Sequence, residues 1–211
     1  RLNRFVFRSG LVMKPVFSAA KTATAKRVIY ADGEDERVLR AAQVVLDEGI
    51  ARPILIGRPQ VVETRLKRYG LRIRPGQDFE LINPHDDPRY RSYVDLMVEL
   101  AGRRGVTPES ARTLVRTNST VIAALAMRRG DADAMICGLE GRFERHLRYV
   151  STLIGSRADV NERGLSALSM LISTRGVLFF TDTYVTVDPT AAEIAEMTVL
   201  AAQEIRRFGM V

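Results

Sequence analysis

The sequence is poor in residues on which several classes of protein depend. Its 211 residues include no tryptophan, two histidines and one cysteine. The single cysteine, Cys137, excludes an internal disulfide framework and makes a reducing, cytoplasmic setting the expectation. No grouping of cysteine and histidine has the spacing of a zinc site, so we predict no metal site in this chain.

Long apolar runs are also absent. Runs such as residues 176–181 are far shorter than the roughly 20 residues that a membrane-spanning helix needs, so we expect no membrane partner. The composition is that of an ordinary globular protein, with 46% hydrophobic and 27% charged residues. A chain of this length can bury a sizeable core, as one large domain or two small ones.

Acidic residues are missing from positions 1–27, which hold seven basic residues. The net charge of +7 would by itself suggest nucleic acid as a partner. The other 25 basic residues are balanced by 25 acidic ones, so the body of the chain is neutral and we expect no nucleic-acid partner. The basic stretch could be a transit peptide, a nucleic-acid arm or a linker. Its apolar residues favour the linker. We expect residues 1–21 to be a connector from an upstream domain, with Phe5, Phe7 and Phe17 packed against a neighbour.

Strand-like and helix-like patterns alternate through residues 22–150. Apolar runs at 27–31, 53–57, 78–82 and 133–137 are separated by segments with apolar residues at helical spacing. Helix starts are marked as well, for example by Thr107, Pro108 and Glu109 as N-cap, first-turn proline and early acid. The alternation predicts a first α/β domain with a mostly parallel sheet and helices on both faces.

The pattern changes in residues 151–211. Two apolar runs, 164–173 and 176–182, are separated by a short turn, which favours a hairpin over a crossover. A helix is predicted over residues 189–208. Two strands and one helix bury too little surface for an independent core, so we expect a partial second α/β unit that depends on its neighbours.

One segment, DADAMICGLEGRFERHLR at residues 131–148, raises the question of function. It reads as a buried strand, a Gly-Leu-Glu-Gly turn and an arginine-rich helix. Ligands collect beyond the carboxyl ends of parallel strands, where helix N-termini attract anions. The turn is therefore either an anion site or an ordinary connection, since Gly-x-x-Gly is neither a dinucleotide fingerprint nor a phosphate loop. His146 is interpreted as a solvated residue on an exposed helix face, and Cys137 as a small apolar residue in the packing.

Four stretches together resemble the phosphate acetyltransferase family: RVIYADGEDERVLRAA, DEGIARPILIGRP, GDADAMICG and FFTDTYVTVDPTAAEIAEMTVLAAQE. They resemble the variant fused to the C-terminus of bacterial NADP-dependent malic enzymes, and FVFRSGLVMKPVFSAAK resembles the connector that precedes this domain in those fusions. The resemblance covers nearly the whole chain and implies the phosphate acetyltransferase fold.

The resemblance also shows what is missing. Active members carry a pattern like S-G-A-x-H-T-T-A-D-T-x-R-P after this strand, where this chain reads CGLEGRFERHLRY. Gly138, Leu147 and Arg148 are compatible with the pattern. The serine is replaced by Cys137, the histidine by Gly141, the two threonines by Arg142 and Phe143, and the proline by Tyr149. The family's catalytic serine and aspartate are expected beyond Val211. Acetyl transfer needs a base for the thiol and donors for the oxyanion, so no catalytic residue is assigned.

The resemblance therefore implies a regulatory and assembly domain of a malic enzyme that binds acetyl-CoA as an allosteric effector. The effector-binding residues it implies are Gly138, Glu140, Gly141, Arg142, Arg148 and Asp182. The implied partners are an acyl-CoA, the upstream catalytic domain of the malic enzyme and further copies in a homo-oligomer. NADP and a divalent metal are implied only for that catalytic domain, and no cofactor for this chain. The alternatives are an active phosphate acetyltransferase, converting acetyl-CoA and phosphate into acetyl phosphate and CoA, and a basic interaction module.

Overall fold

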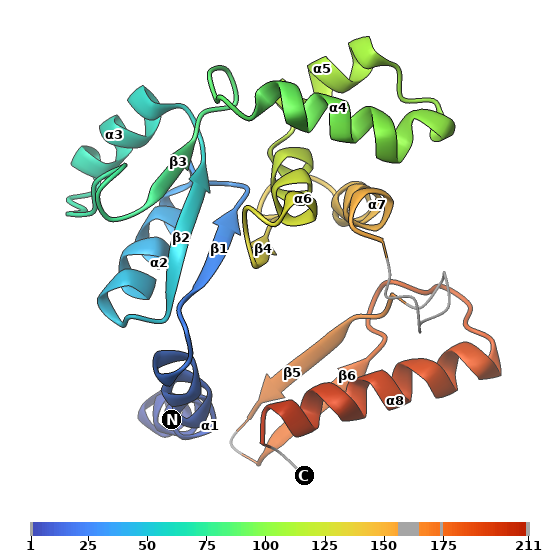
Figure 1. The fold of residues 1–211 in the computed structure, drawn as a ribbon. Helices are drawn as coiled ribbons and strands as arrows, with labels where there is room; N and C mark the ends of the chain where they lie inside the picture. Colours follow the sequence, from blue (N-terminus) through green and yellow to red (C-terminus); the bar gives the residue numbers. More distant parts are fainter. Residues whose placement is uncertain (1, 156–164, 174, 210–211) are drawn as a thin grey trace. The chain divides into compact units, whose positions relative to one another are not determined.

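The structure, a computed structural model, describes residues 2–155, 165–173 and 175–209, with side chains from residue 9 onward. The chain divides into two compact units (Figure 1). The larger unit is Ala23–Gly155, and the smaller one combines Arg1–Thr22 with Ser156–Val211. The candidate site described below lies within the larger unit.

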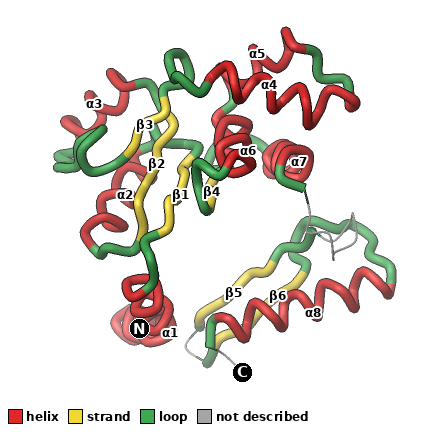
Figure 2. The backbone as a smooth tube through the Cα atoms, viewed as in Figure 1, coloured by secondary structure: helices red, strands yellow, loops and turns green. Residues whose placement is uncertain are grey.

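Four parallel strands form the sheet of the larger unit, in the order β3-β2-β1-β4 (Figure 2). They are β1 Lys26–Tyr30, β2 Ala51–Ile56, β3 Glu80–Ile82 and β4 Ala134–Ile136. β1 pairs with β2 on one side and with β4 on the other. The chain first winds away from β1 toward β3 and later returns to the opposite side of β1. The carboxyl end of β1 is therefore the topological switch point, where open α/β sheets bind ligands.

Helices cover both faces of this sheet. Successive side chains of a strand point to opposite faces, so each strand packs against helices on both sides. Ile29 and Ile54 pack with the helices of one face, whereas Tyr30 and Leu55 pack with those of the other. The last residues of β1 and β2 are buried on both faces, which explains why these runs are apolar without alternation. The prediction of a buried strand at β4 is wrong, because β4 is the last strand in the sheet order and Ile136 is 53% exposed. The first face carries α4 Tyr90–Ala101, α5 Pro108–Thr117, α6 Ser119–Arg129 and α7 Phe143–Leu153, and the second carries α2 Glu36–Asp47 and α3 Pro59–Arg68. The predicted α/β fold with a parallel sheet and helices on both faces is confirmed.

Capping side chains mark the starts of three helices of the larger unit, α2, α5 and α6. Thr107 accepts a hydrogen bond from the Ser110 amide, as predicted, with Pro108 in the first turn of α5. The short 3-10 helix η1, Gly102–Arg104, separates α4 from this start. Asn118 ends α5 and at the same time caps α6 through the Val121 amide. This shared cap brings the end of one helix and the start of the next to the same point beside the sheet.

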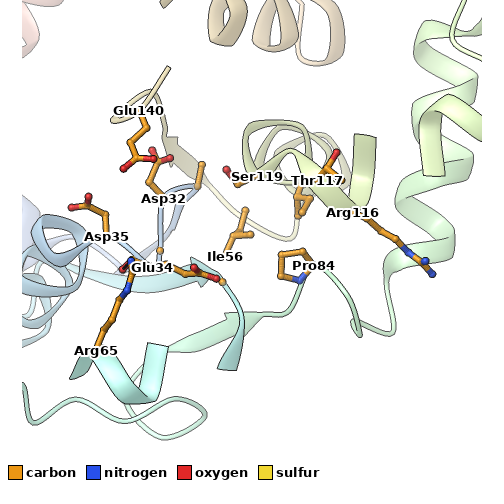
Figure 3. Close-up of a pocket in the computed structure, with 14 residues that line it drawn as sticks. Asp32, Glu34, Asp35, Ile56, Arg65, Pro84, Arg116, Thr117, Ser119 and Glu140 are labelled. Atoms are coloured by element: carbon orange, nitrogen blue, oxygen red, sulfur yellow. Dashed lines mark hydrogen bonds between the residues drawn. The ribbon is translucent and has the colours of Figure 1, made fainter. Parts of the chain in front are cut away.

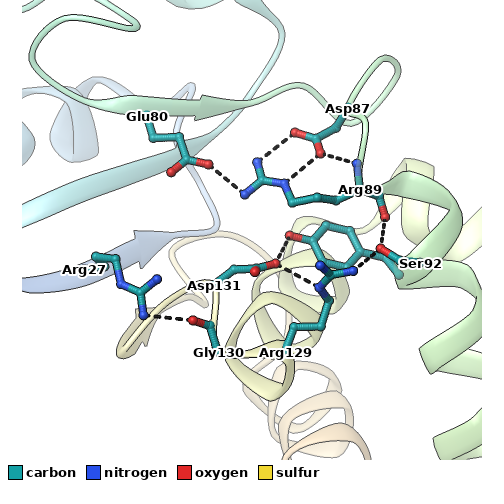
Figure 4. Close-up of polar contacts among 9 residues, drawn as sticks. Arg27, Glu80, Asp87, Arg89, Ser92, Arg129, Gly130 and Asp131 are labelled. Carbon is teal, nitrogen blue, oxygen red and sulfur yellow. Dashed lines mark hydrogen bonds and ion pairs between the residues drawn. The ribbon is translucent and has the colours of Figure 1, made fainter.

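Arginines and carboxylates join β3, α4 and the segment between α6 and β4 (Figure 4). The Arg89 guanidinium contacts Glu80 at 2.7 Å and Asp87 at 2.9 Å. Burial acts to raise the pKa of Asp87, but the hydrogen bonds from Arg89 outweigh it and the pKa is lowered. Asp131 accepts from the hydroxyl of Tyr93 at 3.0 Å and pairs with a neighbouring arginine. These contacts tie the start of α4 to β3 and the body of α4 to the segment after α6.

The smaller unit contains α1 Leu2–Thr22, β5 Leu168–Ile172, β6 Val177–Thr181 and α8 Ala191–Arg207. β5 and β6 are antiparallel, with Leu171 opposite Leu178, which confirms the predicted hairpin. α8 begins with a capping box formed by Thr190 and Glu193.

The segment predicted as a connector is helical, and it groups with the smaller unit. Phe17 is 45% exposed, while the side chains of Phe5 and Phe7 lie outside the described residues. No helix in the described ranges combines the length and apolar character needed to cross a bilayer.

Candidate functional site

A pocket of about 280 Å³ lies at the switch point of the sheet (Figure 3). Its walls come from the residues that follow β1 and β2, from the junction of α5 and α6, and from the loop after β4. Among the lining residues are Asp32, Gly33, Glu34, Asp35, Arg65, Arg116, Thr117, Ser119 and Glu140. Topology explains the convergence, since parallel strands end at the same edge and α6 begins there.

Glycine at position 33 allows the loops after β1 and β2 to meet. A Cβ atom at Gly33 would lie 2.6 Å from the carbonyl oxygen of Ile56 and 2.8 Å from its amide nitrogen. Both atoms belong to the backbone, so they cannot move aside as a flexible side chain would. Only glycine fits this part of the wall.

Carboxylates outnumber guanidinium groups in the lining, and two of the carboxylates are paired with arginines. Glu34 accepts from Arg58 at 2.8 Å, and this hydrogen bond lowers the pKa of Glu34. Asp35 caps α2 and pairs with Arg37, which lowers the pKa of Asp35 in the same way. The described residues contain no group of three or more histidine, cysteine, aspartate or glutamate side chains that could hold a metal ion.

The charge balance of the lining decides which ligands the pocket suits. Four carboxylates stand against two guanidinium groups in it. Arg58 and Arg37, which lie outside the lining, pair with Glu34 and Asp35, so the charges around the pocket are nearly balanced. The carboxylates of Asp32 and Glu140 can accept hydrogen bonds from hydroxyl and amide donors.

The Gly-Leu-Glu-Gly loop closes the pocket on the β4 side. Gly138 and Gly141 have φ angles of +94° and +98°, in the region that side chains rarely adopt. The Leu139 amide donates to the carboxylate of Asp32 at 3.1 Å. This amide is therefore engaged and is not available to a ligand. Glu140 is the residue of the loop that lines the pocket.

His146 holds the same loop from the other side. Its Nε2 lies 2.7 Å from the carbonyl oxygen of Glu140, and its Nδ1 lies 2.8 Å from the hydroxyl oxygen of Thr120. A carbonyl only accepts, so Nε2 carries the hydrogen and, in the neutral ring, Nδ1 accepts from the hydroxyl. Thr120 is only 1% exposed. The interpretation of His146 as a solvated surface residue is wrong, because α7 turns this side chain toward α6.

Cys137 packs at the end of β4 against the core of this face, as interpreted from the sequence. Burial raises the pKa of its thiol, and the nearby carboxylate of Asp32 acts in the same direction. Both effects favour the neutral thiol, so Cys137 is a packing residue and a poor nucleophile.

Five of the six residues implied as effector-binding belong to the larger unit, and Asp182 belongs to the smaller one. Gly138, Glu140 and Gly141 lie together in the loop beside the pocket. Arg142 precedes α7 and is exposed, without a side-chain capping bond. Arg148 is exposed on α7, with its guanidinium 5.9 Å from the centre of the Tyr149 ring, and it is not among the described residues that line the pocket.

Asp182 belongs to the smaller unit and organises a turn there. Its carboxylate accepts from the backbone amides of Ala167 at 2.9 Å, Val185 at 3.2 Å and Thr186 at 2.7 Å. Burial acts to raise the pKa of Asp182, but these hydrogen bonds lower it overall. The side chain thus stabilises the turn after β6.

Sequence reasoning missed Asp32, Arg116 and Ser119 as residues of the pocket. Asp32 directly follows the first strand, so the rule about carboxyl ends of strands would have found it. Arg116 and Ser119 flank the break between α5 and α6. The sequence also held a signal for His146. It stands three residues before Tyr149 and seven before Leu153, so all three lie on the face of α7 that packs on the core.

A parallel sheet with helices on both faces and a pocket at its switch point places this domain in the class of doubly wound α/β domains. The chain belongs to the phosphate acetyl/butaryl transferase family, whose model matches residues 11–211. The EutD phosphotransacetylase from Staphylococcus aureus shares the fold, with a TM-score of 0.82 and 24% identity over 96% of this chain and 59% of that chain.

Malic enzymes contain the same kind of domain. The chain is 68% identical over 210 residues to the NAD-dependent malic enzyme of Rhizobium meliloti and 44% identical to the NADP-dependent malic enzyme of Escherichia coli. All of this chain is covered in both alignments, but it spans only 27% of the length of each relative. The predicted resemblance to the phosphate acetyltransferase-like domain of malic enzymes is confirmed.

Proposed function

We propose that this domain regulates and helps to assemble a malic enzyme, binding acetyl-CoA as an effector without transferring its acetyl group. One observation carries the second half of the proposal: the loop in place of the family's motif presents no free imidazole. Gly141 stands where active members have histidine, and both ring nitrogens of His146 already have hydrogen-bond partners. No imidazole of this loop is therefore available to activate a thiol.

The pocket supports binding of the uncharged part of an acyl-CoA. The pantetheine arm carries amides and a hydroxyl, whose N–H and O–H groups match the carboxylate oxygens of Asp32 and Glu140. An effector changes the rate of malate oxidation only if it binds the active and inactive states with different affinity. Asp32 accepts a hydrogen bond from the loop and also lines the pocket. We propose that binding of the effector at Asp32 changes the position of the loop.

The smaller unit supports the assembly role. Leu171, Leu178 and Phe180 lie on one face of the β5–β6 hairpin and are 50%, 53% and 48% exposed. Contiguous apolar surface of this kind marks an interaction site. We propose that the upstream catalytic domain or another copy of the protein covers it. NAD or NADP and a divalent metal would belong to the catalytic domain, and the relatives' names include both nicotinamide cofactors.

Two assays on the full-length protein test this function. Malate oxidation should respond to acetyl-CoA in the micromolar to millimolar range, and acetyl phosphate with CoA should yield no acetyl-CoA. Formation of acetyl-CoA in proportion to protein concentration would instead support the alternative, an active phosphate acetyltransferase. A malate saturation curve that acetyl-CoA leaves unchanged would overturn the regulatory role.

A further inference from the structure

A second cavity, the arginine groove, lies between α4 and α5 of the larger unit, which pack side by side (Figure 1). Its volume is about 650 Å³. The residues that line it are Tyr90, Arg91, Val94, Asp95, Arg112, Thr113 and Arg116. Three guanidinium groups therefore share the groove with one carboxylate.

No ion pair offsets the arginines of the groove within the ranges that the structure describes. Arg91 and Asp95 stand four residues apart on α4, but their side chains form no ion pair. Arg112 and Arg116 have no carboxylate partner either. These two also stand four residues apart, on α5, where like charges destabilise a helix slightly. The lining thus keeps a net charge of +2, which carboxylates from outside the domain would neutralise.

Tyr90 gives the groove a defined shape. The guanidinium of Arg116 lies 4.6 Å from the centre of the Tyr90 ring, a cation–π contact. The Tyr90 hydroxyl donates to the carbonyl oxygen of Arg112 at 3.2 Å. Both contacts join the start of α4 to α5, so the groove is formed before any partner binds. A preformed surface lowers the entropy that binding costs.

The composition and the openness of the groove fit a protein partner. Arginine and tyrosine are enriched at protein–protein interfaces, and Arg91 and Arg112 are both exposed to solvent. The chain spans only 27% of the length of the malic enzymes that it resembles. A segment of the same polypeptide is present at an effective concentration of about a millimolar. Exposed ion pairs, which are weak in isolation, are then sufficient to hold it.

We propose that the arginine groove docks an acidic segment of the upstream catalytic domain, with Arg91 and Arg112 paired to its carboxylates. The inference rests on the proposed function, since it names a surface through which this domain joins the malic enzyme. It gives the larger unit a polar contact of its own, in addition to the apolar hairpin of the smaller unit.

Zero-length cross-linking of the full-length protein tests the contact directly. Arg112→Lys keeps the positive charge and introduces an amine, which a carbodiimide couples to any carboxylate that touches it. Mass spectrometry should find position 112 joined to an aspartate or glutamate of the upstream domain. The matched control is Arg104→Lys, because Arg104 is exposed and lines neither cavity. It should give about tenfold less product, and about 0.5 M salt should suppress the product at position 112 by screening.

Charge reversal gives a second readout. Arg91→Glu with Arg112→Glu should release the docked segment, so hydrogen exchange in the peptide that carries the coupled carboxylate should become several-fold faster. Arg103→Glu with Arg104→Glu reverses the same number of charges at exposed positions outside the groove. This control should leave the exchange unchanged.

The outcomes separate the groove from the proposed function. Coupling of position 112 only to Asp95 or to another carboxylate within residues 1–211 would overturn the docking assignment. Equal yields at positions 112 and 104 would also overturn it, and so would a yield that falls when the protein is diluted, because the partner would then be another copy. The response of malate oxidation to acetyl-CoA is measured separately. If that response is absent while the coupling is normal, the effector role is wrong and the docking surface stands.

Discussion

His146 should couple the stability of the domain to the order of the pocket loop. The substitution His146→Ala removes the hydrogen bonds to the Glu140 carbonyl oxygen and to the Thr120 hydroxyl, at 2.7 and 2.8 Å. The two lost partners are unequal. Glu140 is exposed, so water can replace the imidazole at its carbonyl, whereas Thr120 is 1% exposed and water cannot easily reach its hydroxyl.

The magnitude follows from this difference. A neutral hydrogen bond contributes about 1 kcal/mol net, and a buried hydroxyl left without its partner costs roughly 1–3 kcal/mol. Thr120 also keeps a hydrogen bond with Cys137, so the lower part of that range applies. We expect His146→Ala to reduce the free energy of unfolding by about 2–3 kcal/mol.

A double-mutant cycle isolates the contact. Thr120→Val keeps the shape of the side chain and removes the hydroxyl, and by itself should cost about 1 kcal/mol. In the double variant neither polar partner remains, so the loss should fall short of the sum of the single losses by about 1 kcal/mol. The measurement is equilibrium urea denaturation of the four proteins. Arg145→Ala, an exposed change one residue away, is the control and should alter the free energy of unfolding by less than about 0.5 kcal/mol.

Hydrogen exchange reports the second consequence, the release of the loop. The Leu139 amide is protected by its bond to Asp32, and this protection depends on the loop staying in place. Exchange in the peptide that contains Leu139 should be faster in His146→Ala and unchanged in Arg145→Ala. Strictly additive free energies together with unchanged exchange would refute the positioning role of His146.

Two further predictions concern other parts of the domain. If Arg148 contacts the effector, Arg148→Ala should weaken acetyl-CoA binding in a titration by about 10- to 100-fold, whereas Arg145→Ala should not; equal affinities would show Arg148 to be a surface residue. The pKa of Asp87 is lowered in the folded state. Its ion pair with Arg89 therefore stabilises the fold at pH values above the unfolded pKa of about 3.9. This stability is lost as the pH falls through the lower pKa of the folded state. Asp87→Asn should accordingly flatten the decline in unfolding free energy below about pH 5, and identical pH profiles of wild type and variant would contradict the role of the pair.

The sequence alone determined the secondary structure and the fold class. Strand period, helix period and caps such as Thr107 depend on residues within a few positions of one another, so they can be read along the chain. The parallel sheet follows from the alternation of strands and helices, and the hairpin of the smaller unit from the short turn between two apolar runs. The sequence also pointed to the loop after β4, because ligands bind at the carboxyl ends of parallel strands. It did not identify Asp32, Arg116 or Ser119 as residues of the pocket.

Only the tertiary structure decided what surrounds that site. The bond between Leu139 and Asp32 joins residues 107 positions apart, and the contact between His146 and Thr120 spans 26 positions. No local period encodes such pairs, because they depend on how α6, α7 and β1 pack together. The fold likewise collected carboxylates and arginines from separate parts of the chain around the switch-point pocket. The physical reason is that hydrogen bonding and charge act over a few ångströms in space, whatever the separation along the chain.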